Sequence, residues 1–255
     1  MSVDARCPNC EAACAGDYCA ACGQKLRIVW SARELYTRTA IDFGHLDHVV
    51  ARTLFDLLRR PAALIRDNLR GRTQPYARPF GTLTLVASAY FLLVLSVPEL
   101  LPGAMRFHVS GAPTPEQQAV YDRVREGTAK FAQYAYLAVV PIAALLGRML
   151  SRAPRRSYGE WVLIQAYVYC GLALLELVLA LPFVAWPEAY ERAARGPLAM
   201  LSWAYATWAL RGVLDIGWVR AVFHALLATM LPATLMRASV SLGVYLWLHF
   251  GGGGA

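Results

Sequence analysis

Long apolar runs dominate the chain from residue 81 onward, and short polar connections separate them. The runs cover residues 81–101, 131–150, 161–186, 198–218 and 221–250. An α-helix of about 20 apolar residues crosses the hydrocarbon core of a bilayer. The first three runs meet that length, the fourth does so with Arg211 at a membrane edge, and the fifth carries Arg237. The pattern predicts an all-α integral membrane protein with about five transmembrane helices, and four is the alternative count.

Two further segments precede the predicted membrane bundle of residues 81–250. Residues 1–24 are rich in cysteine, and residues 25–80 are basic, with apolar positions at helical spacing. Basic amphipathic helices beside a first span commonly lie in the membrane interface, which is our interpretation of this stretch. The alternative is packing against the cytoplasmic ends of the spans. The glycine-rich end, residues 251–255, is predicted to be a flexible tail.

Composition and charge agree with a membrane protein. The chain is 57% hydrophobic and 16% charged, whereas a soluble domain is nearer 25% charged. The net charge is +8, and 12 of the 25 Lys and Arg residues lie within residues 1–78. An excess of basic residues before the first span follows the positive-inside rule, so nucleic-acid binding is the less favoured explanation.

The loops also predict an orientation. The first thirty residues lack the apolar core of a signal peptide and hold five of the six cysteines, which suits the reducing cytoplasm. Residues 1–80, 151–160 and 211–220 then lie inside, where the arginine clusters belong. We therefore predict a multi-pass membrane protein with a cytoplasmic N-terminus and its C-terminus on the opposite side of the membrane.

The cysteines carry the clearest chemical signal in the chain. Cys7 and Cys10 form one C-x-x-C pair, and Cys19 and Cys22 form a second pair. Four thiolates complete the tetrahedral shell of a structural Zn²⁺ and leave no open position for water. The spacing predicts a zinc ribbon with one structural zinc, and its alternative is a dithiol redox pair.

The other cysteines and a histidine pair are weaker candidates. Cys14 lies inside the ribbon and is interpreted as a bystander, or as a thiol that replaces a ligand under oxidation. Cys170 is interpreted as a packing residue of the third run. His45 and His48 could share a helix face, but without an identified third ligand they are more often surface residues.

The chain resembles an uncharacterised bacterial membrane-protein family, a domain of unknown function with a four-cysteine zinc ribbon before several transmembrane helices. The family's Cys-Gly-Gln ending corresponds to Cys22–Gln24, and its Thr-x-x-x-Leu-x-x-x-Pro stretch to Thr53, Leu57 and Pro61. An element with Gly71, Tyr76 and Pro79 follows before the first span. The resemblance implies a ribbon and several helices and supplies no catalytic residues. Because the family is bacterial, it also implies the bacterial inner membrane, with a periplasmic C-terminus.

The element before the first span suggests contact with lipid. Arg70, Arg72 and Arg78 could bind lipid phosphates, and Tyr76 suits the headgroup region. The alternative is a purely structural elbow that leads into the membrane.

Two charges inside the predicted spans invite a pairing. Glu176 lies 15 residues into the third run and Arg237 lies 16 residues into the fifth, so the two side chains could reach similar depth. Because an unpaired ion in the bilayer is costly, we predict an intramembrane ion pair between Glu176 and Arg237.

The sequence contains no recognised phosphate loop, nucleophile elbow or zinc-protease motif, so we do not predict an enzyme. The first hypothesis is a non-enzymatic membrane scaffold that docks a protein partner through its cytoplasmic ribbon. The second is a small transporter or lipid-handling protein that uses Glu176 and Arg237. The third is a thiol and zinc redox sensor. Membrane lipid is an expected partner in each, and the oligomeric state is left open.

Overall fold

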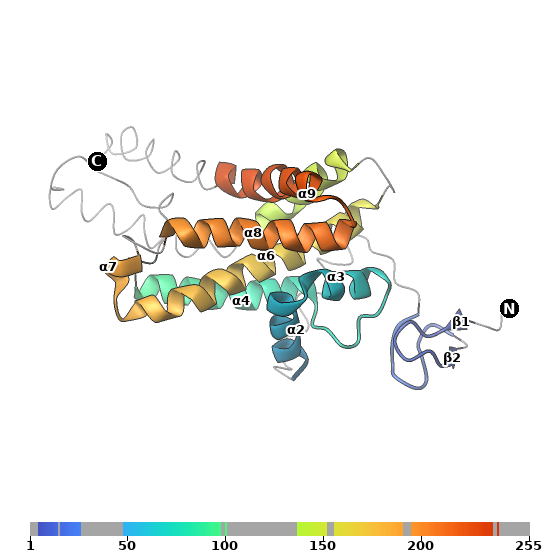
Figure 1. The fold of residues 1–255 in the computed structure, drawn as a ribbon. Helices are drawn as coiled ribbons and strands as arrows, with labels where there is room; N and C mark the ends of the chain where they lie inside the picture. Colours follow the sequence, from blue (N-terminus) through green and yellow to red (C-terminus); the bar gives the residue numbers. More distant parts are fainter. Residues whose placement is uncertain are drawn as a thin grey trace, which may run out of the picture.

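The structure is a computed structural model that describes residues 5–14, 16–26, 48–97, 100, 137–151, 156–190, 195–236 and 239. These residues form a small ribbon of two short strands beside a bundle of helices (Figure 1). The ribbon strands are β1 (Ala5–Arg6) and β2 (Ala13–Cys14), which pair antiparallel. Two helices, α2 (His48–Arg59) and α3 (Pro61–Leu69), precede the longer helices of the bundle in the sequence.

The bundle contains the longer helices. They are α4 (Pro79–Ser96), the helix Leu137–Leu150, α6 (Tyr158–Ala180) with the 3₁₀ turn η4 (Leu181–Val184), α7 (Pro187–Ala189), α8 (Arg195–Leu214), and α9 (Trp218–His224), which continues as the π-helical η6 (Ala225–Met230).

Helix α6 is the centre of the bundle. Its first turn is fixed by a capping box, in which Ser157 accepts from the Glu160 backbone and Glu160 accepts from the Ser157 backbone. Every residue from Trp161 to Leu174 is buried, and α6 contacts α2, α3, α4 and α8. A helix that is apolar on all sides suits this enclosed position.

The two amphipathic helices pack into the core. Leu57 of α2 and Leu64 and Ile65 of α3 are fully buried in the same cluster as Tyr167 of α6. Both helices contact α6, and α3 also contacts α8. Their apolar faces therefore pack against the bundle helices. Packing against the helices was the alternative to a position within the membrane interface.

The π-helical turn of residues 225–230 precedes Pro232. Proline has no backbone N–H and its ring displaces the carbonyl four residues earlier, so the helix before it widens or kinks. The Tyr169 hydroxyl donates to the Thr229 carbonyl at 2.6 Å, which supplies a partner inside the bundle. Membrane helices tolerate such breaks where neighbouring side chains bind the freed backbone groups.

Among the described residues, two helices are long and apolar enough to cross a membrane. They are Tyr158–Val184 and Trp218–Met236. Pro79–Leu93 and Leu137–Leu150 are shorter apolar helices, whereas α8 is long enough, with 20 residues, but is less apolar than the two candidate spans. The structure thus supports two membrane spans and not the five that the apolar runs predicted. One reason is that the helices described within residues 81–101 and 131–150 are shorter than those apolar runs.

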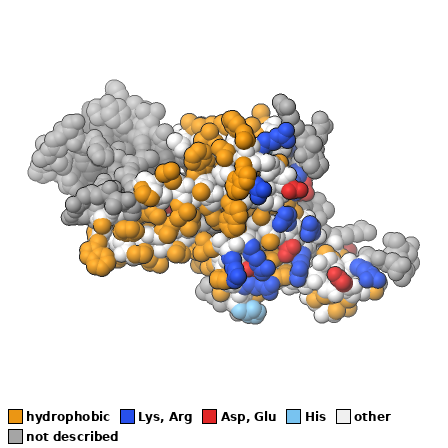
Figure 2. Space-filling view, viewed as in Figure 1, with side chains coloured by type: hydrophobic (Ala, Val, Ile, Leu, Met, Phe, Trp, Pro, Cys, Tyr) orange, Lys and Arg blue, Asp and Glu red, His pale blue; other side chains and the backbone are white. Residues whose placement is uncertain are grey.

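Charged and apolar side chains occupy different parts of the visible face (Figure 2). Lys and Arg side chains gather on the side toward the ribbon, and apolar side chains spread over the rest of the bundle. Large apolar side chains are exposed on several bundle helices, among them Leu92, Ile142, Met149, Met200, Val219, Phe223 and Leu235. A surface of this kind suits contact with lipid better than contact with water.

Candidate metal centre

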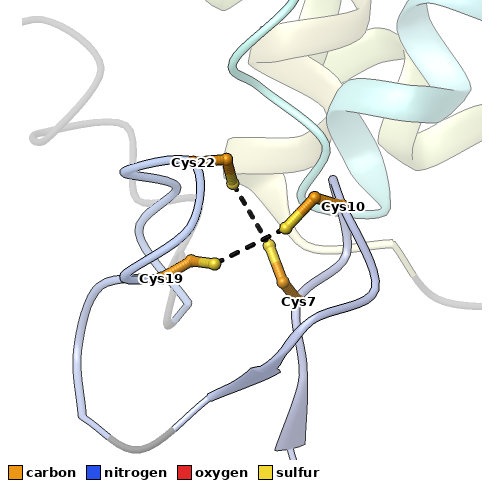
Figure 3. Close-up of side chains that lie close together, drawn as sticks. All are labelled: Cys7, Cys10, Cys19 and Cys22. Carbon is orange, nitrogen blue, oxygen red and sulfur yellow. Dashed lines mark hydrogen bonds between the residues drawn. The ribbon is translucent and has the colours of Figure 1, made fainter.

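The four predicted ligands meet at one point of the ribbon (Figure 3). The sulfurs of Cys7, Cys10, Cys19 and Cys22 all lie within 4.8 Å of one another. The Cys7 and Cys22 sulfurs are 3.6 Å apart, and so are those of Cys10 and Cys19. The close pairs therefore join one knuckle to the other.

These distances fit a zinc ion. A zinc–sulfur bond of about 2.3 Å in a tetrahedron places the ligand sulfurs about 3.8 Å apart. The donor set, four thiols with no oxygen ligand among them, suits Zn²⁺ better than Mg²⁺ or Ca²⁺. The cluster is thus compatible with a metal site, and Cys7, Cys10, Cys19 and Cys22 are the residues that would hold the ion.

The two knuckles share one backbone design. The Cys7 N–H donates to the Ala12 carbonyl at 2.9 Å, and the Cys19 N–H donates to the Gln24 carbonyl at 2.8 Å. The carbonyl of each of these cysteines also accepts from the residue four positions later. Each C-x-x-C turn is therefore closed by the same pair of hydrogen bonds, which aims its two thiols toward the other knuckle.

Hydrogen bonds distribute charge unevenly over the thiols. Loss of solvation opposes ionisation of Cys19, but backbone hydrogen bonds from Ala21 and Cys22 lower its pKa to about 6. A backbone hydrogen bond from Ala12 favours ionisation of Cys10, yet the neighbouring thiols raise the pKa of Cys10 to about 12. Thiolates that share one shell repel each other, so a bound divalent cation is what would let all four ionise together.

Cys14 and Cys170 are not among the four clustered thiols, although the Cys14 side chain lies close enough to interact with Cys19. The Cys14 thiol donates to the Ala12 carbonyl at 3.3 Å, and loss of solvation is the main reason that the pKa of Cys14 rises to about 11. A thiol that ionises so weakly is a poor nucleophile at neutral pH. Cys170 is buried in the middle of α6, as a packing residue would be.

Sequence reasoning missed the structural role of Gln24, which joins the ribbon to the loop before α4. Its side chain is fully buried. The Gln24 Oε1 accepts from the backbone N–H groups of Thr73 and Gln74, at 3.2 and 3.1 Å. Its Nε2 donates to the Thr73 hydroxyl at 3.0 Å and to the Lys25 carbonyl at 2.9 Å. The carbonyl of the same residue closes the second knuckle, so the metal site and the clamp share one residue.

The loop that Gln24 binds is attached on its other side to the bundle core. The Ala77 N–H donates to the Thr53 hydroxyl at 2.8 Å, and the Tyr167 hydroxyl donates to the Ala77 carbonyl at 2.8 Å. The Tyr167 hydroxyl also lies 3.3 Å from Oδ1 of the buried Asn68. A continuous series of hydrogen bonds thus runs from the ribbon through residues 73–77 to α6.

The residues predicted to contact lipid headgroups lie in this loop or next to it in the chain. Arg70, Arg72 and Arg78 are exposed. Arg72 lies 4.0 Å from a carboxylate oxygen of Asp67. Tyr76 is buried, and its hydroxyl donates to the same carboxylate at 3.0 Å. Burial is the main cause that raises the pKa of Tyr76, and the hydrogen bond to Asp67 raises that pKa further. Lipid contact by these four residues stays a prediction.

The second predicted pair is described only in part. Glu176 lies in α6 and is half-buried, whereas Arg237 lies outside the described residues, so their contact stays a prediction. His48 begins α2 and is exposed, and His45 lies outside the described residues. The 251–255 tail is also outside them.

No protein-family model, curated protein or solved structure matches this chain. The resemblance to the ribbon-bearing membrane family therefore stays a prediction. The residues that carry it nevertheless have identifiable structural tasks. Thr53 binds the loop, Leu57 fills the core, Gly71 has a φ of 88°, and Pro79 opens α4.

Proposed function

We propose that this chain is a non-enzymatic, multi-pass protein of the bacterial inner membrane whose cytoplasmic zinc ribbon docks a protein partner. The observation that carries the proposal is the closed four-cysteine shell, held against the bundle by Gln24. A closed shell leaves no coordination position for a substrate, so the metal would fold the ribbon instead of performing chemistry.

The outer side of the ribbon suits a docking role. Tyr18 is 61% exposed there, beside the exposed Asp17, and Pro8 and Glu11 are exposed on the first knuckle. Exposed tyrosines are common energetic centres of protein interfaces. Because Gln24 binds the ribbon to the loop of residues 73–77, a partner would meet these exposed residues in a fixed orientation relative to the bundle.

A membrane location is supported by the two helices that could cross a bilayer and by the exposed apolar side chains of the bundle. The proposal extends this to about five spans, with α4, the helix Leu137–Leu150 and α8 as the additional ones. Arginines gather toward the ribbon, which favours placing that side in the cytoplasm.

The first test is the metal content of the detergent-purified chain, wild type and Cys19→Ser, by elemental mass spectrometry. We expect about one zinc per wild-type chain, as one shell of four thiolates requires, and its loss in the variant. Little metal in a reduced, folded wild type would overturn the ribbon assignment and favour the redox-sensor hypothesis.

The docking role is tested with a photo-cross-linking amino acid at Tyr18 and, as a matched control, at Phe55 of α2, which is 58% exposed. We expect a discrete cross-linked protein from the Tyr18 position in cells, lost on Cys19→Ser. The same product from both positions, or its survival without zinc, would contradict docking by the ribbon.

A second candidate, the small transporter, is favoured by buried polar side chains between α6 and the continuous helix of α9 and η6. Thr229 donates to Gln165 at 3.2 Å, and the Gln165 Nε2, the Trp161 Nε1 and the His224 Nδ1 are buried without a partner among the described residues. Polar side chains within a membrane bundle often mark a substrate path. A water-soluble thiol reagent would modify His224→Cys in a transporter and leave it unreacted in a packed core, with the buried Ala173→Cys as control.

A further inference from the structure

Arginine side chains from separate segments meet at the C-terminal end of α8. Helix ends leave backbone carbonyls without intrahelical partners. The Arg66 Nη1 of α3 donates to the Gly212 carbonyl at 3.1 Å, and the Arg156 Nη2 donates to the Val213 carbonyl at 3.4 Å. These bonds attach two guanidinium groups to consecutive carbonyls in the last turn of α8.

A third guanidinium lies beside the same end. Arg211 stands over the ring of Trp218, 4.4 Å from its centroid, and both side chains are exposed. The acid at this end is Asp215, which follows α8, and no ion pair joins it to Arg211 in this described segment. Glu160, near Arg156 in sequence, is bound to the Ser157 N–H at 2.6 Å.

The position of Trp218 sets the depth of these arginines in a bilayer. It opens the candidate span Trp218–Met236, whose 19 residues extend about 28 Å at 1.5 Å each, close to the hydrocarbon thickness. Tryptophan at a span end lies at the level of the headgroups. Arg211, stacked on that ring, therefore lies at the level of the lipid phosphates.

We propose that Arg66, Arg156 and Arg211 form a binding site for the phosphate of an anionic phospholipid headgroup. Each guanidinium presents five N–H donors in a planar fork that matches phosphate oxygens, and a single bond to a helix carbonyl leaves donors for a ligand. The acyl chains would lie along the exposed apolar side chains of Val219, Phe223 and Leu226.

This site is separate from the Arg70, Arg72, Tyr76 and Arg78 set, and it rests on the proposed membrane placement. It explains why three like charges lie at one helix end although no ion pair joins any of them to an acid among the described residues. The negative end of the α8 dipole offsets part of their repulsion, and a phosphate would offset more.

The test is a titration of the purified full chain in detergent with phosphatidylglycerol or phosphatidylcholine of equal chain length, followed by native mass spectrometry. We expect phosphatidylglycerol to bind more tightly. Arg66→Gln with Arg211→Gln should weaken that binding about 25-fold, roughly fivefold per arginine. Arg211→Gln alone should cost about fivefold without removing a bond to an α8 carbonyl, so it decides the matter if the double variant does not fold.

The matched control is Arg6→Gln, which removes the same charge from an exposed ribbon position. Equal binding of the two lipids to the wild type, or an equal loss in Arg6→Gln, would refute the site. Full displacement of the lipid by inorganic phosphate would assign the arginines to a soluble anion instead and overturn the lipid assignment. Failure of the chain to integrate into membranes would refute the proposed function, whereas the absence of a lipid preference in an integrated wild-type chain would refute this site alone.

Discussion

The residues that follow the two C-x-x-C pairs share a left-handed backbone conformation but differ in type. Glu11 has a φ of 62° and Gly23 a φ of 71°. The N–H of each donates to the carbonyl of the first cysteine of its knuckle, at 2.9 and 2.8 Å. Glycine adopts this conformation without steric cost, whereas another residue pays about 1 kcal/mol. The first knuckle is therefore strained where the second is relaxed.

This difference predicts opposite effects of two substitutions on zinc affinity. Glu11→Gly should tighten zinc binding about fivefold and Gly23→Ala should weaken it by a similar factor, because folding and metal binding are one equilibrium. Space is not the cause, since a Cβ at Gly23 would meet its nearest neighbour at an ordinary 3.6 Å. Competition with a chelator on the full chain measures both, and weaker binding by Glu11→Gly would show that strain is not what distinguishes the knuckles.

At this scale the sequence predicted the ligands but not the clamp. The ligands follow from a local spacing of cysteines, which has few structural meanings. Gln24 shows no comparable signal, because its partners Thr73 and Gln74 lie 49 and 50 residues away along the chain. Gln24 belongs to the Cys-Gly-Gln ending of the ribbon, but this motif does not indicate what the side chain binds.

Among the elements, the loop of residues 71–79 is bound by the ribbon on one side and by α6 on the other. Gln24→Ala should release its ribbon side. The amide hydrogens of Thr73 and Gln74 should then each exchange about fivefold faster, the effect of losing one hydrogen bond worth about 1 kcal/mol. Zinc should be retained, since no ligand is touched. Hydrogen exchange with mass spectrometry measures both amides.

The control for the loop is Gln74→Ala. Its side chain is exposed and its backbone N–H still donates to Gln24, so exchange should match the wild type. If Gln24→Ala leaves both amides as protected as in the wild type, the ribbon does not hold the loop.

Close packing of α6 against α8 predicts that a larger residue at Gly171 would destabilise the bundle. A Cβ on Gly171 would clash with the Tyr205 hydroxyl, which donates to the Leu57 carbonyl at 2.9 Å. Gly171→Ala should therefore lower the free energy of unfolding by about 1–3 kcal/mol. Gly81→Ala in α4 meets nothing within 4 Å and should raise that energy by up to about 1 kcal/mol. Thermal unfolding in detergent compares the two, and equal melting temperatures would argue against this packing.

Helix positions could largely be predicted from the apolar pattern, but the partners of each face could not. The spacing of Leu57, Leu64 and Ile65 indicates amphipathic helices, yet it fits a lipid interface and a protein core equally well. The core is what the structure shows. The π-helical turn was missed because Pro232 indicates a break without indicating its form.

For the whole molecule, the arginine-rich side and the exposed apolar surface together predict how the bundle lies in a bilayer. Helix α8 is decisive, because its 20 residues extend about 30 Å while its hydropathy is lower than that of the two candidate spans. Its last turn contains Arg211, which stacks on Trp218 at the proposed headgroup level. An arginine held at that depth lets the rest of α8 cross the hydrocarbon core.

Two glycines at opposite ends of α8 test this placement. Gly196 and Gly217 are both exposed, and a Cβ at either meets nothing within 4 Å. In vesicles of known orientation, a membrane-impermeant thiol reagent should modify Gly217→Cys only from the cytoplasmic side and Gly196→Cys only from the periplasmic side. Peptide mass spectrometry separates these sites from the native cysteines.

Labelling of both positions from one side would mean that α8 does not cross the membrane. The count would then fall to four spans or fewer, and α9 would need the opposite orientation. Labelling from opposite sides, with Gly217 cytoplasmic, would place α8 across the bilayer with the ribbon, the loop of residues 71–79 and the arginines around Gly212 on the same side. The ribbon would then present its docking surface in the compartment where its thiols stay reduced and bind metal.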